Sequence, residues 1–159
     1  MLTRKTKLNE ILKLSSGCKK CGKCCGFSSG FLLDEDVSRI AKFLKIAEKE
    51  FIGKYLEKKE MYGKQVHRIK APCAFLENSQ CKIHDAKPLN CRIATCKPVG
   101  EEISAWFMLN YFVDEKNPQS IRDWKICLEC GGKNIPGGNL EEIVPDKTRL
   151  KRILDYEVL

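Results

Sequence analysis

The chain has 159 residues, of which 43% are hydrophobic and 31% charged, and its mean hydropathy is −0.35. This length suits one domain of ordinary size. No stretch reaches the roughly 18 uninterrupted apolar residues of a transmembrane helix, so we expect a soluble protein without a membrane span. The formal net charge of +8 suggests nucleic-acid binding, but it counts all ten cysteines as neutral.

Metal binding would change this charge balance. A ligating cysteine is deprotonated, and a zinc ion held by four thiolates carries a net charge of about −2. Two such sites would lower +8 to about +4. Many lysines stand beside cysteines in the sequence, where they can offset the charge of a metal site. We therefore favour this role for the lysines over a nucleic-acid-binding face.

Residues 1–17 predict a basic N-terminal helix, with Leu8 and Ile11 on its apolar side. Asn9 and Glu10 interrupt what would be the apolar core of a signal peptide, so we expect no export and a cytoplasmic location. In a reducing compartment, clustered cysteines bind metal or do redox chemistry more often than they form disulfides.

The motif CKKCGKCCG begins at Cys18 and places Cys18, Cys21, Cys24 and Cys25 within eight residues. Two intervening residues let successive sulfurs turn toward one metal ion or cluster, so we interpret residues 18–30 as a metal-binding loop. Burial of these cysteines as small apolar side chains is the alternative, which the intervening lysines disfavour. Adjacent cysteines diverge in extended backbone, so this pair indicates two centres.

The next segment predicts two helices. Asp34 can cap the first helix, in which Val37, Ile40 and Leu44 repeat with helical spacing. A second, shorter helix is predicted at about residues 50–59. We expect this pair to be the scaffold of the fold.

A hairpin is predicted within residues 64–83, where two β-prone runs flank the turn Glu-Asn-Ser-Gln at residues 77–80. Cys73 and Cys81 would flank that turn. The hairpin would therefore bring two further thiols together.

The C-terminal part predicts further helices. Pro88 favours the first turn of a short helix that carries Cys91. Residues 103–113 are apolar almost all round, which suits a buried element, and we favour a helix. An amphipathic helix is expected to close the chain at about residues 146–156.

The predicted ligand set gathers thiols from remote segments. Eight thiols would suffice for two four-coordinate sites: Cys18, Cys21, Cys24, Cys25, Cys73, Cys81, Cys91 and Cys130. His84 has a spacing from Cys81 that is compatible with zinc, but we expect it to contact ligands rather than the metal. His67 is expected to be an ordinary surface histidine on a strand.

Several motifs in fixed order resemble a known family. They are CKKCGKCC, LLDEDVSRIAKFLKI, EFIGKYL, PCAFLENSQCKIHDAKPLNCR and Cys130-Gly131. In these the chain is similar to the zinc- or iron-chelating cysteine-cluster proteins of bacteria and archaea, often called YkgJ-type. The resemblance implies a metal-binding cysteine cluster but no definite reaction, and a similar arrangement in flagellin lysine methylases keeps an enzymatic role open.

Two cysteines depart from the family pattern. Cys96 and Cys127 are extra thiols, which would replace other ligands, extend a site or simply pack. We include both among the candidate metal ligands.

The expected fold is α+β: a small single domain of mostly short helices plus a β-hairpin, stapled by the metal-binding cysteine cluster. Residues 1–17 would form the basic helix and residues 18–138 the metal-binding domain. Residues 139–159 would end in a helix that packs on the same domain.

The expected cofactor is Zn²⁺ or an iron-sulfur cluster, at one or two centres. The expected role is structural, electron-transferring or metal-carrying. One alternative is an enzyme or enzyme subunit associated with methyl transfer or redox chemistry, and another is a zinc-ribbon-like nucleic-acid binder. The sequence shows no catalytic set built on a nucleophile and no small-molecule substrate, and it leaves an unidentified protein partner open.

Overall fold

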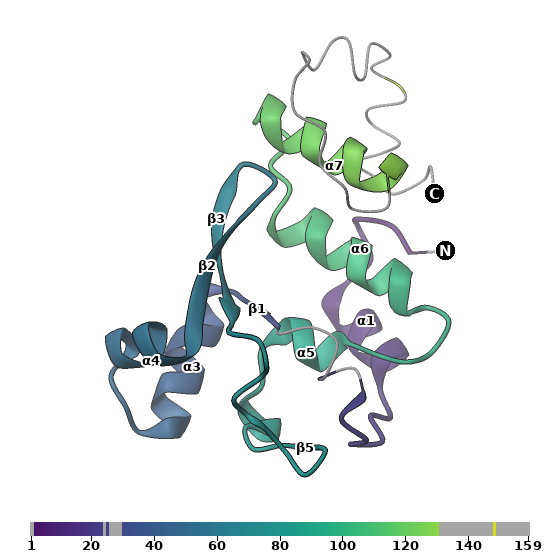
Figure 1. Cartoon of the computed structure of the whole chain (residues 1–159). Helices are drawn as coiled ribbons and strands as arrows, with labels where there is room; N and C mark the ends of the chain where they lie inside the picture. The colour runs from purple at the N-terminus through teal and green to yellow at the C-terminus, as the bar shows by residue number, and fades with distance from the viewer. Residues whose placement is uncertain (1, 24, 26–29, 131–147, 149–159) are drawn as a thin grey trace. The chain divides into compact units, whose positions relative to one another are not determined.

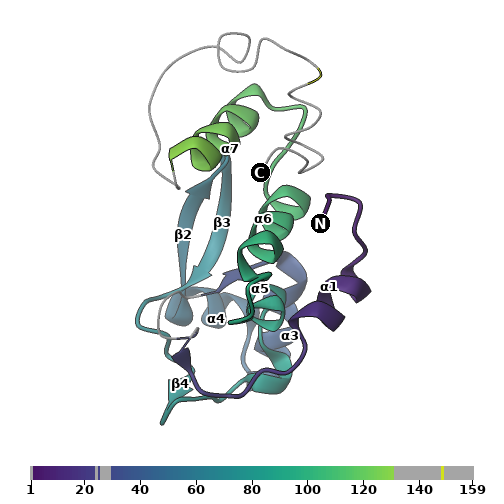
Figure 2. The same cartoon turned by 90° about the vertical axis from the view of Figure 1, so that its right-hand side faces the viewer.

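The computed structural model describes residues 2–23, 25, 30–130 and 148 (Figures 1 and 2). Contacts between Cα atoms divide the chain into two compact units. Unit 1 comprises Met1–Lys7, Glu60–Lys64 and Ala105–Leu159, and unit 2 comprises Leu8–Lys59 and Gln65–Ser104. The expected boundary at residues 138 and 139, and the expected helix at residues 146–156 apart from Thr148, lie outside the described residues.

Unit 2 begins with helix α1 (Leu8–Ser15), which packs against the short helix α5 (Leu89–Ile93). The predicted N-terminal helix is thus confirmed, with Ile11 fully buried. Helices α3 (Asp34–Leu44) and α4 (Glu48–Tyr55) pack on each other, as their apolar stripes require. Pro88 is the N-cap of α5 rather than its first helical residue.

The start of α3 corrects a prediction. Leu33, not Asp34, is the N-cap residue, and the Asp36 carboxylate accepts the Leu33 N–H at 3.0 Å. An acidic side chain in the first turn therefore replaces the predicted N-cap side chain.

A three-stranded sheet has the order β1-β3-β2 and contains strands β1 (Phe31–Leu32), β2 (Leu56–Met61) and β3 (Lys64–Ile69). The prediction of a helix as far as residue 59 was wrong, because the chain leaves α4 at Tyr55 and continues as β2. Tyr62 and Gly63 connect β2 to β3 with φ angles of 54° and 74°. Two consecutive positive φ angles are what a type I′ hairpin turn requires.

A second hairpin confirms the predicted turn. Strands β4 (Leu76–Glu77) and β5 (Gln80–Cys81) pair antiparallel, and Leu76 lies opposite Cys81. Asn78 and Ser79 form the turn, again with positive φ angles of 49° and 62°. The one-turn helix η1 (His84–Ala86) follows.

The apolar core of unit 2 lies between the helix pair, the sheet and the second hairpin. Its buried members are Leu32, Val37, Ile40, Ala41, Phe51, Leu56, Ile69, Phe75 and Ile83. Side chains from α3, α4, the three-stranded sheet and the segments on either side of the β4–β5 hairpin meet in this core, and Cys73 and Cys81 pack against it.

Helix α6 (Gly100–Tyr111) confirms the predicted buried helix; most of it lies in unit 1, as does α7 (Pro118–Cys130), which the sequence analysis missed. Within unit 1, the Trp106 indole N–H donates to the Thr6 carbonyl at 3.0 Å. Trp124 packs edge-on against Tyr62, with ring centroids 5.6 Å apart. The described chain is therefore a mixed helix-and-strand fold, as predicted.

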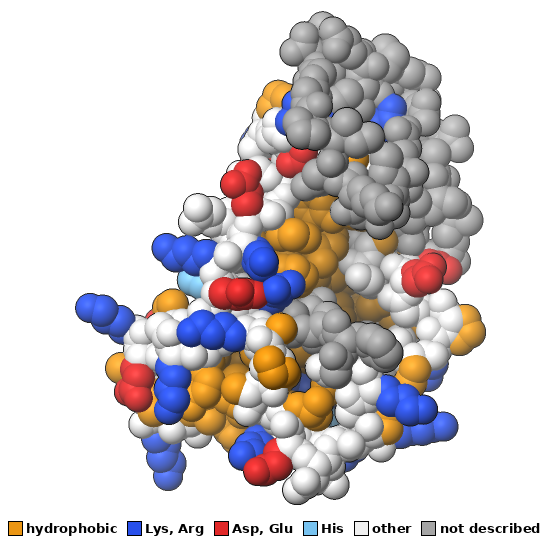
Figure 3. All heavy atoms as spheres, in the orientation of Figure 1, with side chains coloured by type: hydrophobic (Ala, Val, Ile, Leu, Met, Phe, Trp, Pro, Cys, Tyr) orange, Lys and Arg blue, Asp and Glu red, His pale blue; other side chains and the backbone are white. Residues whose placement is uncertain are grey.

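The surface carries charges of both signs. On the face drawn in Figure 3, the described Lys and Arg side chains are interspersed with acidic and apolar ones. Every described helix falls short of the length and apolarity that a bilayer crossing needs.

Candidate metal centre

The first cysteine motif begins as a loop over residues 18–22, whereas Lys23 and Cys25 are helical, which the predicted loop over residues 18–30 did not include. The Lys20 N–H donates to the Cys18 sulfur at 3.4 Å, with Lys20 at a positive φ of 53°. Gly22, at φ 71°, lies against the β4–β5 turn so closely that an added Cβ would come within 2.7 Å of the Ser79 carbonyl oxygen. The loop therefore lies beside the hairpin that carries Cys81 and that begins three residues after Cys73.

The β4–β5 hairpin contains the same kind of N–H to sulfur hydrogen bond as the first cysteine loop. The Ile83 N–H bonds to the Cys81 sulfur, two residues before it, just as Lys20 bonds to Cys18. A backbone N–H that donates to sulfur favours the thiolate over the thiol. The two segments thus offer sulfurs in the same local geometry.

Cys91 lies on α5, where backbone from β1 approaches closely. A Cβ added at Gly30 would collide with the Cys91 sulfur, so a larger residue here would require the Cys91 side chain or the backbone to shift. Next to Cys91, the Asn90 side-chain oxygen accepts the Phe31 N–H at 3.2 Å. Close backbone approach and one hydrogen bond thereby fix Cys91 relative to the sheet.

The surroundings of Cys91 disfavour its charged form in the metal-free protein. Burial raises the pKa of Cys91 to about 12, and the nearby thiols of Cys25, Cys73 and Cys81 add to this rise. Lys87 acts in the opposite direction. A thiol that titrates this high needs a nearby cation to become a thiolate near neutral pH.

Cys81 belongs to the same neighbourhood. Burial raises its pKa, the Ile83 N–H opposes that rise, and the charges of Cys73 and Cys18 add to it. Linked through Cys81 and Cys91, five thiols therefore share one electrostatic neighbourhood in unit 2: Cys18, Cys25, Cys73, Cys81 and Cys91.

This donor set suits a soft or borderline metal. Thiolate ligands select zinc or iron-sulfur clusters, and a bound cation would reverse the mutual repulsion of the thiolates. Within the part of the chain that the structure describes, no three His, Cys, Asp or Glu side chains are already placed to hold a metal ion.

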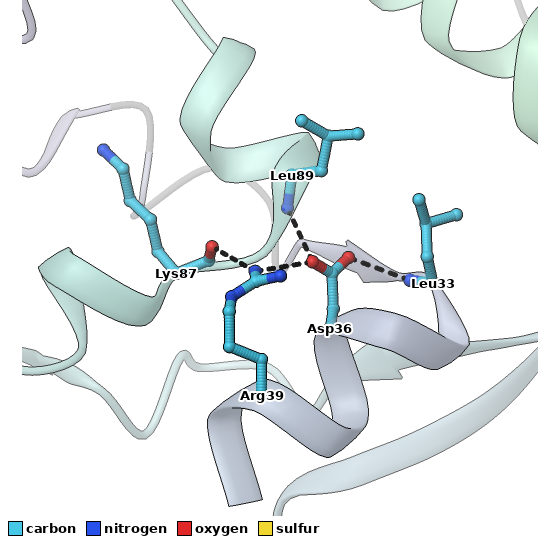
Figure 4. Close-up of polar contacts among 5 residues, drawn as sticks. All are labelled: Leu33, Asp36, Arg39, Lys87 and Leu89. Carbon is cyan, nitrogen blue, oxygen red and sulfur yellow. Dashed lines mark hydrogen bonds and ion pairs between the residues drawn. The ribbon is translucent and has the colours of Figure 1, made fainter. Parts of the chain in front are cut away.

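A buried carboxylate joins α3 to the start of α5 (Figure 4). Asp36 is 1% exposed, and its carboxylate accepts hydrogen bonds from the Leu33 N–H, from the Leu89 N–H at 3.1 Å and from Arg39 at 2.7 Å. Arg39 also donates to the Lys87 carbonyl at 3.0 Å. These contacts hold the two residues that flank Pro88.

The remaining predicted ligands lie in several places. Cys21 and Cys96 are exposed in unit 2, whereas Cys127 lies in unit 1 on α7, where its sulfur accepts a hydrogen bond from the Tyr62 hydroxyl at 3.4 Å. Cys24 and the side chain of Cys130 lie outside the described residues. The assignment of individual metal ligands stays a prediction.

The two histidines differ in their surroundings. The pKa of His84 is lowered by burial and by the charges of Lys87 and Lys20, so the neutral ring is favoured. His67 lies on β3 opposite Leu32, on a strand as predicted. The charge effect of Lys20, a residue of the first cysteine loop, is the smaller of the two lysine effects on His84.

Three residues around the start of α5 were not among the predicted site residues: Gly30, Asp36 and Asn90. Gly30 was assigned only to a loop, and Asp36 lay within a predicted helix without a role of its own. A signal for Asp36 existed, because Asp36 and Arg39 are three residues apart on one helix face. Its burial and its contact with Leu89 depend on tertiary packing and leave no local pattern.

Comparison with known proteins identifies the cysteine region. The model of a family described as "CxxCxxCC: Putative zinc- or iron-chelating domain" matches residues 17–118, well over half of the chain. An uncharacterized protein of Methanocaldococcus jannaschii is 30% identical over 96 residues, which are 58% of this chain and 52% of that relative. The chain thus spans about half the length of this relative, and no solved structure matches it. With the cysteine motif and the family match in agreement, the chain belongs to the CxxCxxCC family of zinc- or iron-chelating domains.

Proposed function

We propose that unit 2 binds a metal centre through the thiolates of its cysteine cluster, and that this centre joins three segments of the chain. The observation that carries the proposal is the shared electrostatic neighbourhood of Cys18, Cys25, Cys73, Cys81 and Cys91. Once deprotonated, these thiols would repel one another, and a bound cation would offset that repulsion.

The metal centre would have a structural role, because it would stabilise the packing of these segments. The first cysteine loop approaches the β4–β5 hairpin closely at Gly22, and the hairpin strands have two residues each. Such small elements bury little apolar surface and gain little stability from packing. Metal binding would supply that stability, because the free energy of binding adds to that of folding.

Zinc is the metal that we favour. A short Cys-x-x-Cys loop followed by glycine is typical of structural zinc sites, and a closed site of four thiolates stabilises rather than catalyses. An iron-sulfur cluster on the same thiols would carry electrons instead. The five linked thiols are enough for one four-coordinate centre, so one centre in unit 2 is the simplest form of the proposal.

Anaerobic purification followed by metal analysis and a visible spectrum tests the proposal. We expect about one equivalent of zinc and no visible colour, whereas brown protein containing iron and sulfide would establish the iron-sulfur alternative. Cys81→Ser should lower the metal content, and Cys96→Ser, which removes an exposed thiol outside the linked set, should not. Compact protein without zinc or iron after anaerobic isolation would overturn the proposal.

A further inference from the structure

Helix α5 lacks a capping group of its own. Its N-cap residue is Pro88, which offers no side-chain acceptor, and the helix has only five residues. A helix this short is marginal by itself. The Leu89 N–H, the first in the helix, is instead bound by the Asp36 carboxylate from α3 at 3.1 Å.

Asp36 is held in place from several sides. It is 1% exposed, it bonds to the Leu33 N–H at the start of its own helix, and it pairs with Arg39 at 2.7 Å. Arg39 reaches on to the Lys87 carbonyl at 3.0 Å. The chain is therefore held by α3 both before and after Pro88, immediately ahead of Cys91.

Resting on the proposed function, we infer that Asp36 is a positioning residue for the metal centre: it sets the first turn of α5 so that the Cys91 sulfur faces the other thiols. Leu89, which Asp36 binds, precedes Cys91 by two residues in the same turn. Gly30 confines the Cys91 sulfur from the sheet side. Asp36 would thus act on the metal only through Cys91.

Asp36→Asn tests this role with a near-isosteric change that removes the charge and one acceptor oxygen. Groups that orient metal ligands typically change metal affinity by 10 to 100-fold. We expect Asp36→Asn to bind Co²⁺ and Zn²⁺ about tenfold or more weakly in competition with a chelator. The near-ultraviolet thiolate-to-cobalt absorption should also weaken, because its intensity follows the number of bound thiolates.

Phe51→Leu is the matched control for a purely structural role. Phe51 is fully buried in the core of unit 2 and takes no part in the contacts drawn in Figure 4. This variant should lose stability but keep the full cobalt spectrum and the wild-type affinity for Co²⁺.

Arg39→Lys, which keeps a cation beside Asp36, should retain more affinity for Co²⁺ than Arg39→Met. If Asp36→Asn and Phe51→Leu lose stability and bind Co²⁺ alike, the inference is overturned.

A metal-free measurement separates this inference from the proposed function. Alkylation of Cys91 by iodoacetamide, followed by mass spectrometry of the chelator-treated protein, reports how well α5 shields the thiol. We expect alkylation about tenfold faster in Asp36→Asn and unchanged in Phe51→Leu, since local opening controls access to buried groups. An unchanged rate in Asp36→Asn would overturn the placement of Cys91 by Asp36. Wild-type protein that takes up neither Co²⁺ nor Zn²⁺ would overturn the proposed function, and with it the metal-positioning role.

Discussion

Cys91 in unit 2 and Cys127 in unit 1 are both half-buried thiols on helices, yet their surroundings are opposite. The neighbours of Cys91 include three other thiols, whose charges add to the effect of burial on its pKa. Cys127 instead receives a hydrogen bond from the Tyr62 hydroxyl at 3.4 Å.

The two sites differ in the kind of group that lies beside the sulfur. Burial and the hydrogen bond with Cys127 raise the pKa of Tyr62, so the phenol stays a neutral donor and the sulfur beside it has a partner. The thiols around Cys91 are instead close enough to one another that the charge on one disfavours ionisation of the next. A buried cysteine therefore suggests a metal site only when a bound cation would offset charge repulsion between its sulfur and neighbouring thiolates.

Replacing Cys91 or Cys127 by serine should give the largest difference in metal binding between the two sites. Cys91→Ser should lower the affinity for zinc by more than about 100-fold, beyond the usual effect of a group that only orients a ligand. Metal content after purification and the free energy of unfolding should fall together. Cys127→Ser should keep the full metal content. Equal metal loss in both variants would contradict the distinction between the two sites.

Gly30→Ala tests the close approach beside Cys91. The added methyl group would collide with the Cys91 sulfur, and overpacking of this kind costs typically 1 to 3 kcal/mol, so we expect about 2 kcal/mol of destabilisation by chemical denaturation. Cys91→Ala in the same chain should recover part of that loss, because it removes the sulfur.

Gly53→Ala is the control for this substitution. Gly53 lies within α4 with no heavy atom near an added Cβ, so alanine there should stabilise the protein by about 0.5 to 1 kcal/mol. Destabilisation by Gly30→Ala that Cys91→Ala fails to relieve would place the collision elsewhere.

The raised pKa of Cys91 predicts how metal affinity depends on pH. The thiol is protonated below its metal-free pKa of about 12, so binding must release its proton and the affinity must rise with pH. Each released proton contributes up to about tenfold per pH unit, or about 1.4 kcal/mol. Competition with a chelator whose own pH dependence is known, from about pH 6.5 to 8.5, measures this slope. A flat profile would show that no thiol proton is displaced.

Much of the helical scaffold was predictable because its signals are local. The apolar spacing of Val37, Ile40 and Leu44 predicted α3, and the turn at Asn78 and Ser79 predicted the β4–β5 hairpin. In each case the residues that form the element also carry its periodicity or its turn chemistry.

Strand β2 and helix α7 show where local signals failed. The sequence Leu-Glu-Lys-Lys-Glu-Met of β2 has helical composition, and it becomes a strand because the Tyr62-Gly63 turn pairs it with β3. Helix α7 did carry a start signal, Pro118 preceded by Asn117, whose side chain accepts the Gln119 N–H at 3.0 Å. No element was predicted for this segment, in which Cys127 and Cys130 were considered only as candidate metal ligands.

The candidate site was predictable only in part. Cysteine spacing marked the segments that the fold brings together in unit 2. Cys127 was included as an extra candidate ligand, and its partner Tyr62 is 65 residues away along the chain. Neither the phenol beside that sulfur nor the buried Asp36 follows from spacing. Such distinctions depend on tertiary neighbours.

Tyr62→Phe gives the smallest expected effect and the most selective test of the Cys127 environment. The substitution removes the hydroxyl donor but keeps the ring that packs against Trp124. A partly buried hydrogen bond contributes about 0.5 to 1.5 kcal/mol, and a sulfur acceptor is weak, so we expect a loss of about 0.5 kcal/mol in the free energy of unfolding. Metal content and the cobalt spectrum should not change. Lost metal in this variant would mean that Cys127 and its phenol partner support the metal centre after all.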